Sequence, residues 1–430
     1  MKLVLITAAA LLAFEPSAAQ SPPPGERVQL ADLQAEAERV HPAIQAAMRK
    51  VEALRSRIPQ ARALPDPTVS FGWMGNVTPF DVQNGDPSSY RTLSAMQEFP
   101  YPGKRKLRGE IATREVASEQ WNVEAARRKL RAEVAFAFYG LWVSEKSLGI
   151  TRRNKDLLEK LSRIAEEKYK VGRGVQQDVL RANVEVTRLL QRITLLEQQR
   201  RTYQSQLNSL RLKPLEDVVG VEGDLARPQL AYSLQELLDQ AVASSPEVRQ
   251  QEEVIEQSQV AMNLARREYY PDFNTSYMYQ QRPGMPDMHG FTVGIKIPVF
   301  YRDKQRKAVE EISSTLAGVK QTREALRISL LFQVKEQFLM ARASEELLTL
   351  YAKGIVAQSS LALESALASY QTGEVDFLNV ITNFVTLLDS EIAYYQELGG
   401  FYRALTRLEE LTGLQLASGP TAAVQEVREK

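Results

Sequence analysis

The chain has 430 residues, no cysteine, and 54 basic side chains against 53 acidic ones. This nearly balanced charge gives no indication of a nucleic-acid partner. The lack of cysteine excludes disulfides, thiolate metal sites and cysteine nucleophiles.

The N-terminus carries the pattern of a secretory signal. Lys2 precedes an apolar run from Leu3 to Phe14, and small residues follow from Ser17 to Ala19. This pattern predicts a signal peptide over residues 1–19 and export of the mature chain. The apolar run is too short to cross a ~30 Å bilayer core, and no other segment approaches the length of a transmembrane helix. Because no cysteine stands at the cleavage point, no lipid anchor is expected.

Two long stretches without proline predict two long helical hairpins. No proline occurs between Pro102 and Pro214 or between Pro298 and Pro420. Proline is disfavoured inside helices, so such stretches of charged and aliphatic residues are helix candidates. A Tyr-x-x-Gly motif interrupts each stretch, at Tyr169 to Gly172 and at Tyr370 to Gly373, where the chain can reverse. A helix from Lys104 to Val171 would reach ~100 Å, which predicts an elongated molecule.

The helices that follow these motifs have the spacing of a coiled-coil seam. Apolar residues alternate spacings of four and three, which is typical of packed helices rather than of a globular core face. The first series contains Val175, Val179, Ala182, Val186, Leu189, Ile193 and Leu196. Charged residues also occur within the seams, at Arg200, Glu345 and Glu391. They indicate helices that face water on one side.

The two halves of the chain resemble each other at an offset of about 200 residues. The segment from Leu30 to Pro42 resembles that from Leu234 to Pro246, and the Tyr-x-x-Gly motifs recur at similar offsets. Each half is predicted to contain a helix, two strands and a long helical hairpin. The predicted division is a first repeat over residues 20–214, a linker over 215–232, a second repeat over 233–415 and a polar tail over 416–430.

Four runs alternate between apolar and polar residues with the period of a β-strand. Phe71 and Trp73 alternate with Ser70, Gly72 and Met74 in one run, and Val293 and Ile295 share the apolar face of another. Runs of about nine or ten residues match one crossing of a bilayer by a tilted strand. A soluble sheet of two hairpins has the same period. Export, aromatic faces and polar loops favour membrane strands, with Phe71, Trp73, Val293 and Ile295 facing lipid.

Four strands cannot close a barrel by themselves. The smallest single-chain barrels have about eight strands, and an open sheet edge would leave backbone groups unpaired in lipid. If the four strands cross a membrane, several chains must therefore share one barrel. The strand pattern does not fix the number of chains.

No motif of a catalytic or cofactor site is present in the sequence. It contains no Gly-rich phosphate loop, no Gly-x-Ser-x-Gly motif and no paired-histidine metal motif. His41 precedes a proline and is predicted to separate two helices. Met285, Met288 and His289 are residue types that suit a soft metal, but no thiolate or second histidine completes a set. We predict no enzyme activity, no cofactor and no structural metal.

The informative polar residues lie at the two hairpin turns. The first turn runs from Tyr169 through Gly172 to Asp178. The second contains Tyr370, Gly373, Glu374, Asp376 and Asn379. Two interpretations are open: the glycines cap helices in a solvated turn, or the turns form a pore mouth where carboxylates repeated by symmetry select cations.

Together these features resemble the TolC-like outer membrane factor family, the outer membrane efflux proteins. The resemblance covers nearly the whole mature chain, and its most specific motifs are the turn from Tyr169 to Leu180 and its echo from Tyr370 to Val380. The segment from Gln97 to Arg105 resembles the CzcC-like heavy-metal efflux branch.

The resemblance implies a homotrimer in the outer membrane that extends into the periplasm. Its strands, four per chain, would form one twelve-stranded β-barrel above a tunnel of long α-helical hairpins, with residues 215–232 in an equatorial belt. The expected function is the exit duct of a tripartite efflux pump, with heavy-metal cations as candidate substrates. The expected partners are outer-membrane lipid, a periplasmic adaptor protein and, through the adaptor, an inner-membrane transporter.

For the hairpin turns the resemblance implies a gate. Its closed state would be held by links between hairpins that include Tyr370 and Asp178. The family's acidic position in the second turn is Asn379 here, so Glu374 and Asp376 are the nearby carboxylates. The alternatives are a periplasmic adaptor and a structural coiled-coil protein. Two equivalent hairpins without β-rich arms disfavour the adaptor, and the coiled-coil protein leaves the alternating strands unexplained.

Overall fold

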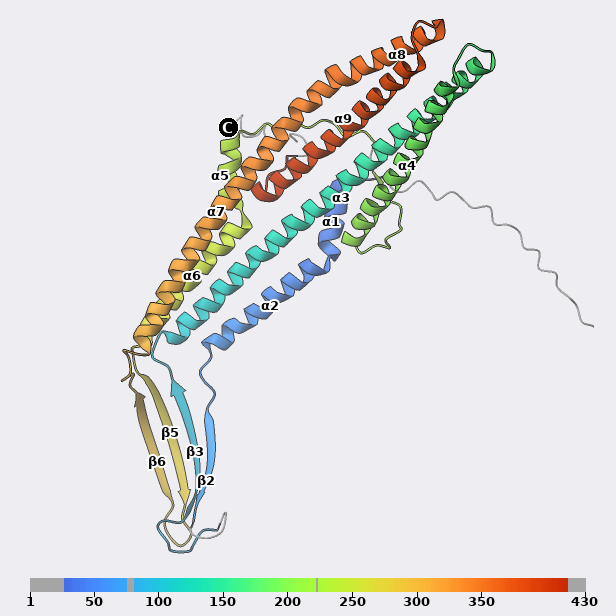
Figure 1. Ribbon diagram of the computed structural model, residues 1–430. Coiled ribbons are helices and arrows are strands. Elements are labelled where there is room, and N and C mark those ends of the chain that lie inside the picture. Colours follow the sequence, from blue (N-terminus) through green and yellow to red (C-terminus); the bar gives the residue numbers. More distant parts are fainter. Residues whose placement is uncertain (1–26, 76–80, 222, 417–430) are drawn as a thin grey trace, which may run out of the picture.

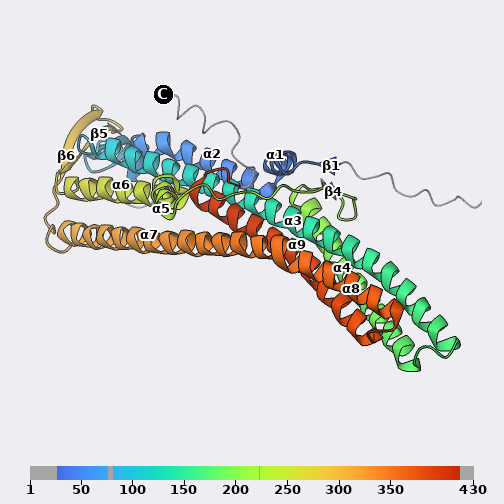
Figure 2. The same cartoon turned by 90° about the horizontal axis from the view of Figure 1, so that it is seen from above.

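The computed structural model describes residues 27–75, 81–221 and 223–416. The predicted signal peptide, and all of the predicted tail except Leu416, lie outside these residues. Figure 1 shows an elongated molecule, with a β-sheet at one end and the tips of two helical hairpins at the other. Figure 2, turned by 90°, shows the same helices running lengthwise from the sheet to the tips.

The first half of the chain forms two short helices, a strand hairpin and a long helical hairpin. Its elements are β1 (Arg27–Val28), α1 (Leu30–Val40), α2 (Pro42–Arg62), β2 (Thr68–Met74), β3 (Tyr90–Phe99), α3 (Lys104–Lys170) and α4 (Gln176–Leu210). As predicted, His41 separates two helices: its Nδ1 accepts from the Ala43 amide at 3.3 Å, while Pro42 begins α2. Proline is favoured there because the first turn needs no amide donor.

The second half repeats this order with one interruption. Its elements are β4 (Gly220–Val221), α5 (Leu234–Ser244), α6 (Pro246–Arg267), β5 (Asp272–Gln281), β6 (Met288–Lys296), α7 (Gln305–Leu350), η1 (Tyr351–Ile355), α8 (Val356–Thr372) and α9 (Phe377–Thr412). The π-helical segment η1 divides what the sequence predicts as one continuous helix. A π turn inserts one residue into the hydrogen-bond ladder, so the apolar face rotates locally.

The four long strands form one antiparallel sheet in the order β2-β3-β5-β6. Leu93 of β3 lies opposite Phe71 of β2 and Tyr279 of β5, so directly paired residues share a face across the sheet. The polar loops at the far end also meet, because the Gly85 amide donates to the Pro283 carbonyl at 2.9 Å. The predicted fold class, long helical hairpins with four antiparallel strands per chain, is confirmed.

The helices pack around α3, which contacts α2, α4, α6 and α9. Midway along the molecule, α1, α3, α5, α7 and α9 share an apolar core that includes Trp142 and Phe401. A second core, which includes Leu158, Phe377 and Phe384, runs toward the tips. Within the described ranges, no helix combines the length and the apolar composition needed to cross a membrane.

Candidate functional site

Both hairpin tips close with the same backbone geometry. Gly172 and Gly373 have φ values of 70° and 85°, a left-handed conformation that glycine adopts without a Cβ penalty. The Arg173 amide donates to the Lys168 carbonyl at 2.8 Å, and the Glu374 amide donates to the Ser369 carbonyl at 2.9 Å. These six-to-one bonds belong to the Schellman motif, so both glycines end a helix as predicted.

The two hairpins of one chain are joined at their tips by Lys168 and Tyr370. Lys168 lies in the last turn of α3, and its Nζ donates to the Tyr370 carbonyl of α8 at 2.6 Å. The same ammonium lies 3.9 Å from the centroid of the Tyr370 ring, close enough for a cation–π contact. The ring itself is buried and packs against Phe377, the first residue of α9.

The carboxylates Asp178 and Asp376 approach each other at this junction. Burial, and then the charge of Asp376, raise the pKa of the Asp178 carboxyl, while Arg181 and Lys168 oppose the shift. Burial, and then the charge of Asp178, raise the pKa of the Tyr370 phenol. The tip of a single chain thus gathers two carboxylates, one phenol and one ammonium.

The remaining predicted tip residues lie on the outside of the turns. The side chain of Asn379 is exposed and accepts from Asn383 Nδ2 at 2.7 Å. Asp376 caps α9, since its Oδ1 accepts from the Asn379 amide at 3.0 Å. Tyr169 and Glu374 are exposed, and among the described residues their side chains make no hydrogen bond or ion pair.

The link that the resemblance implies between Tyr370 and Asp178 stays a prediction. Within one chain, no hydrogen bond joins these two side chains among the residues that the structure describes. The contact that connects the two tips involves Lys168, which the sequence did not single out. A lysine in the last turn of a helix is common because it complements the helix dipole, so nothing in the sequence distinguishes this one.

One face of the sheet carries most of its large apolar side chains, and the register also places Arg91, Gln97, Thr275, Gln281 and His289 there. The register places Phe71, Trp73, Val293 and Ile295 on this face, together with Val69, Leu93, Tyr277 and Phe291. Phe71 and Val293 are 63% and 59% exposed, so the described part of one chain leaves them largely uncovered. Trp73 is partly buried near the loops, where its Nε1 donates to the Asp81 carbonyl at 2.7 Å. We call this surface the apolar face.

The opposite surface of the sheet, here called the polar face, carries small, polar and charged side chains with scattered methionines. Representative paired positions are Ser70 with Ser94 and Ser276 with Thr292. Near the helices, Lys296 Nζ of β6 lies 3.7 Å from Glu98 Oε1 of β3, across the intervening strand β5. An amphipathic sheet of this kind suits a boundary between lipid and water.

Between the sheet and the helices lies a buried ion-pair cluster. Lys104, the first residue of α3, is only 1% exposed. Its Nζ lies 2.8 Å from Asp272 Oδ1 and 2.9 Å from Glu268 Oε2, and it donates to the Tyr270 carbonyl at 3.1 Å. The cluster fixes the start of α3 to the segment that connects α6 with β5.

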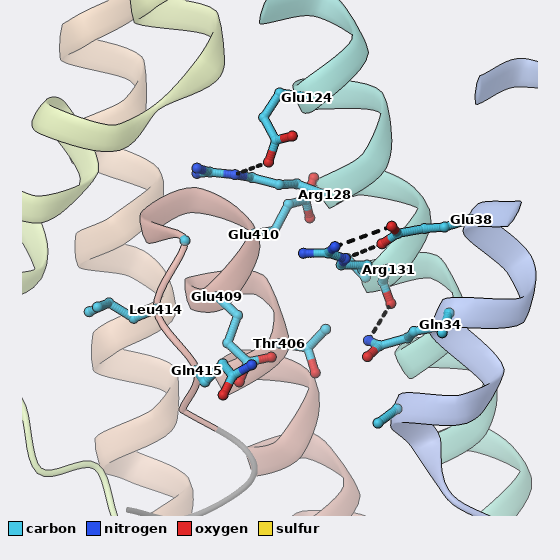
Figure 3. A pocket seen from close by; sticks show the side chains of 14 residues that line it. Gln34, Glu38, Glu124, Arg128, Arg131, Thr406, Glu409, Glu410, Leu414 and Gln415 are labelled. Atoms are coloured by element: carbon cyan, nitrogen blue, oxygen red, sulfur yellow. Dashed lines mark hydrogen bonds and ion pairs between the residues drawn. The ribbon is translucent and has the colours of Figure 1, made fainter. Parts of the chain in front are cut away.

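A cavity of about 390 Å³ lies midway along the molecule, between α1, α3 and the end of α9. Figure 3 shows Arg128 beside Glu124 and Arg131 beside Glu38 among the residues that line it. Arg131 forms an ion pair with Glu38, and Arg128 Nε lies 3.5 Å from Glu124 Oε1. The Arg131–Glu38 pair joins α3 to α1, whereas the Arg128–Glu124 pair lies within α3, so both pairs have structural roles. Within the described part of the chain, no group of His, Cys, Asp and Glu residues is arranged to hold a metal ion.

A fold of long helical hairpins with an open, amphipathic four-stranded sheet is that of outer-membrane channels. In agreement, the family model described as "Outer membrane efflux protein" matches residues 33–211 and 237–414. The chain belongs to the outer membrane efflux protein family.

Three relatives illustrate the similarity. The cobalt-zinc-cadmium resistance protein CzcC of Cupriavidus metallidurans is 22% identical over 376 residues, which cover 86% of each chain. CusC, whose structures are described in terms of transmembrane channel formation, matches with a TM-score of 0.77 at 15% identity, over 89% of this chain and 92% of its own. The outer membrane protein VceC of Vibrio cholerae matches with a TM-score of 0.75 at 17% identity, over 89% and 96%. The predicted resemblance to the family and to CzcC is confirmed.

Proposed function

We propose that the protein is the outer-membrane exit duct of a tripartite efflux pump, and that three copies join their sheets into one barrel. The observation that carries this proposal is the open sheet with an exposed apolar face. In lipid, the unpaired edges of β2 and β6 would be costly unless neighbouring chains pair with them. Each chain then contributes a third of the wall, with the apolar face toward lipid and the polar face toward the lumen.

The helices support the same assembly. Large apolar side chains are exposed on the outer flanks of the two hairpins, such as Leu180, Val184 and Leu195 on α4 and Ile328, Phe332 and Leu339 on α7. Exposed apolar rows of this extent mark interaction surfaces. Because the rows lie on different hairpins, one copy can pack its α4 flank against the α7 flank of the next. Such head-to-tail contacts generate a ring.

In this assembly the hairpin tips form the periplasmic end of the duct. We propose that residues 1–19 are the signal peptide and that residues 215–232 link repeats 20–214 and 233–415 in an equatorial belt. The tip residues would meet a periplasmic adaptor and, through it, an inner-membrane transporter that supplies the energy. The similarity to a cobalt-zinc-cadmium resistance protein favours heavy-metal cations as the substrate.

Arginine substitutions on the two faces of β6 test the proposed barrel. Val293→Arg on the apolar face should cost about 2–4 kcal/mol if the residue lies near the bilayer midplane. Thr292→Arg, one residue before it on the polar face, is the matched control and should be tolerated in a water-filled lumen. Outer-membrane fractionation with analysis of heat-resistant oligomers measures both. The proposal predicts loss of oligomer for V293R alone, whereas equal yields of the two variants would contradict it.

A further inference from the structure

Every long strand of the sheet contains one methionine, and all of them lie on the polar face. They are Met74 of β2, Met96 of β3, Met278 of β5 and Met288 of β6. Their side chains are between 36% and 52% exposed. In the described strands the apolar face carries none, although a thioether is an apolar group that lipid would accept. Their exposure on the polar face therefore needs another explanation.

Three of these residues form a diagonal across neighbouring strands. Met96 pairs with Ser276, so Met278 is its diagonal neighbour on β5. Met278 pairs with Gly290, so Met288 is in turn its diagonal neighbour on β6. Diagonal neighbours lie about 7–8 Å apart at the backbone, within reach of long side chains. The diagonal advances along the strands by two residues, about 7 Å, at each step.

Met74 extends this series by one further step. Met74 lies on the edge strand β2 and pairs with Tyr90 of β3. Met288 pairs with Gln280 of β5, which in turn pairs with Thr92 of β3, two residues after Tyr90. Four successive levels of the polar face thus each contain one thioether. We call Met74, Met96, Met278 and Met288 the methionine row.

The surroundings of the row leave its sulfur atoms accessible. The Met278 methyl group lies over Gly290, only 3.3 Å from where a Cβ would stand, so the missing side chain leaves room for it. Gln280 Nε2 donates to Met278 Sδ at 3.7 Å, which shows that the sulfur points along the face rather than into a core. The residues paired with Met96 and Met278 are serine, threonine and glycine, and Met288 pairs with Gln280. These methionines are not filling an apolar interior.

We propose that the methionine row is a path for soft monovalent cations, Cu(I) or Ag(I), along the inner wall of the barrel. This inference rests on the proposed function, which places the polar face in the lumen. Thioether sulfur is a soft, neutral ligand that favours Cu(I) over hard cations. Conduction requires several sites that each bind weakly enough to release the ion to the next, and thioethers repeated at short steps provide such a series. The row is therefore a set of transit sites and not a resident metal centre.

Silver nitrate is a suitable probe because Ag(I) is redox-stable. The full-length oligomer, labelled with ¹³C at the methionine methyl groups, is titrated with silver nitrate and, separately, with zinc nitrate in chloride-free buffer. The proposal predicts that Ag(I) shifts the methyl resonances of the methionine row at lower concentration than that of Met340, an exposed methionine on α7. Zinc should leave the row unshifted. Equal shifts of the row with both metals, or a Met340 shift at lower silver concentration, would overturn the proposal.

A permeation measurement tests the path itself. The triple variant Met96→Leu, Met278→Leu and Met288→Leu keeps side-chain volume and hydrophobicity, so the sheet should assemble. Met340→Leu is the matched control. Silver nitrate is placed on one side of a planar bilayer and sodium nitrate on the other. For wild type and M340L the reversal potential should show a preference for Ag(I) over sodium, and for the triple variant it should move toward zero.

An unchanged reversal potential in the triple variant would show that the methionine row is not the path. That result would not contradict the proposed function, because a channel that conducts sodium nitrate still acts as a duct. The absence of any conductance in wild-type protein would instead contradict the proposed function, and the inference with it.

Discussion

At the scale of single residues, the hairpin tip is held by interactions that are individually weak. Lys168 reaches the carbonyl and the ring of Tyr370, while the charge of Asp376 opposes that of Asp178. A phenol that donates to a carboxylate stabilises a contact by roughly 1.5–3 kcal/mol when it is shielded from water. Contacts of this strength, repeated by symmetry, would keep a tip closed and still allow an adaptor to open it.

The gate is tested by removing the two groups of the predicted link. Tyr370→Phe combined with Asp178→Ala should raise single-channel conductance in planar bilayers, because the closed tip loses the predicted link between the phenol and the carboxylate, while the Lys168 contact with the residue-370 carbonyl stays. Folding should stay intact, since the Phe ring still packs against Phe377. Tyr169→Phe, in an exposed position with no described polar contact, serves as the control. If the double variant conducts like wild type, the closed state is held by other residues.

The second prediction at this scale concerns the buried Lys104. Lys104→Ala leaves the carboxylates of Asp272 and Glu268 without their shared cation, and breaking such a buried pair costs about 3–5 kcal/mol. We expect the lower end of that range, because Glu268 keeps contact with water. Lys106→Ala, two residues along α3 at an exposed position, should change little. Urea unfolding of the purified oligomer measures both, and equal midpoints would show that the cluster contributes little to stability.

At the scale of helices, close packing depends on a glycine in α3. A Cβ at Gly140 would lie 2.5 Å from Cε1 of the Tyr203 ring on α4, whereas a Cβ at Gly149 would meet nothing within 4 Å. Tyr203 can approach α3 only because Gly140 has no side chain. The first helical hairpin is therefore held together at this point by a ring against bare backbone.

Alanine substitutions at these two glycines should have opposite effects. Gly149→Ala should stabilise α3 by about 0.5–1 kcal/mol, since alanine loses less backbone entropy in a helix. Gly140→Ala gains the same preference but displaces the Tyr203 ring, and overpacking typically costs about 1–3 kcal/mol. Thermal unfolding of the two variants in the same detergent compares them directly. A higher melting temperature for G140A than for wild type would show that Tyr203 moves aside without cost.

Local signals in the sequence predicted the elements well, and contacts between distant segments poorly. The period of two placed the four strands, because side chains alternate between the two faces of a sheet. Proline and the Tyr-x-x-Gly motifs placed the helix ends and both hairpin turns, because backbone conformation decides these positions. The parallel pair β1–β4 joins Arg27 to Gly220 and gave no local signal. The π-helical segment η1 was missed as well. Of the candidate sites, alternation grouped Phe71, Trp73, Val293 and Ile295 on one face of the sheet, while their contact with lipid stays a prediction. Local patterns could not identify Lys168 as a residue that joins the two hairpin tips.

At the scale of the whole molecule, a single chain is an incomplete wall. Within the described residues, its sheet has two open edges and an uncovered apolar face, and its helical flanks carry exposed apolar rows. Each of these surfaces is costly in isolation, and in the proposed duct one ring of copies would cover the edges and flanks while lipid would cover the apolar face. One arrangement of strands and helices thus supports the proposed membrane barrel, tunnel and oligomer together.

The most direct test is to count the chains and measure conductance in the same purified sample. Native mass spectrometry of the detergent-solubilised oligomer gives the number of copies, and insertion of that species into planar bilayers measures its conductance. The account predicts a trimer that inserts and conducts ions through a single pore, with higher conductance when the tip contacts are removed. A monomer, or an oligomer that enters bilayers without conducting even in the Y370F/D178A variant, would contradict the assignment as an exit duct.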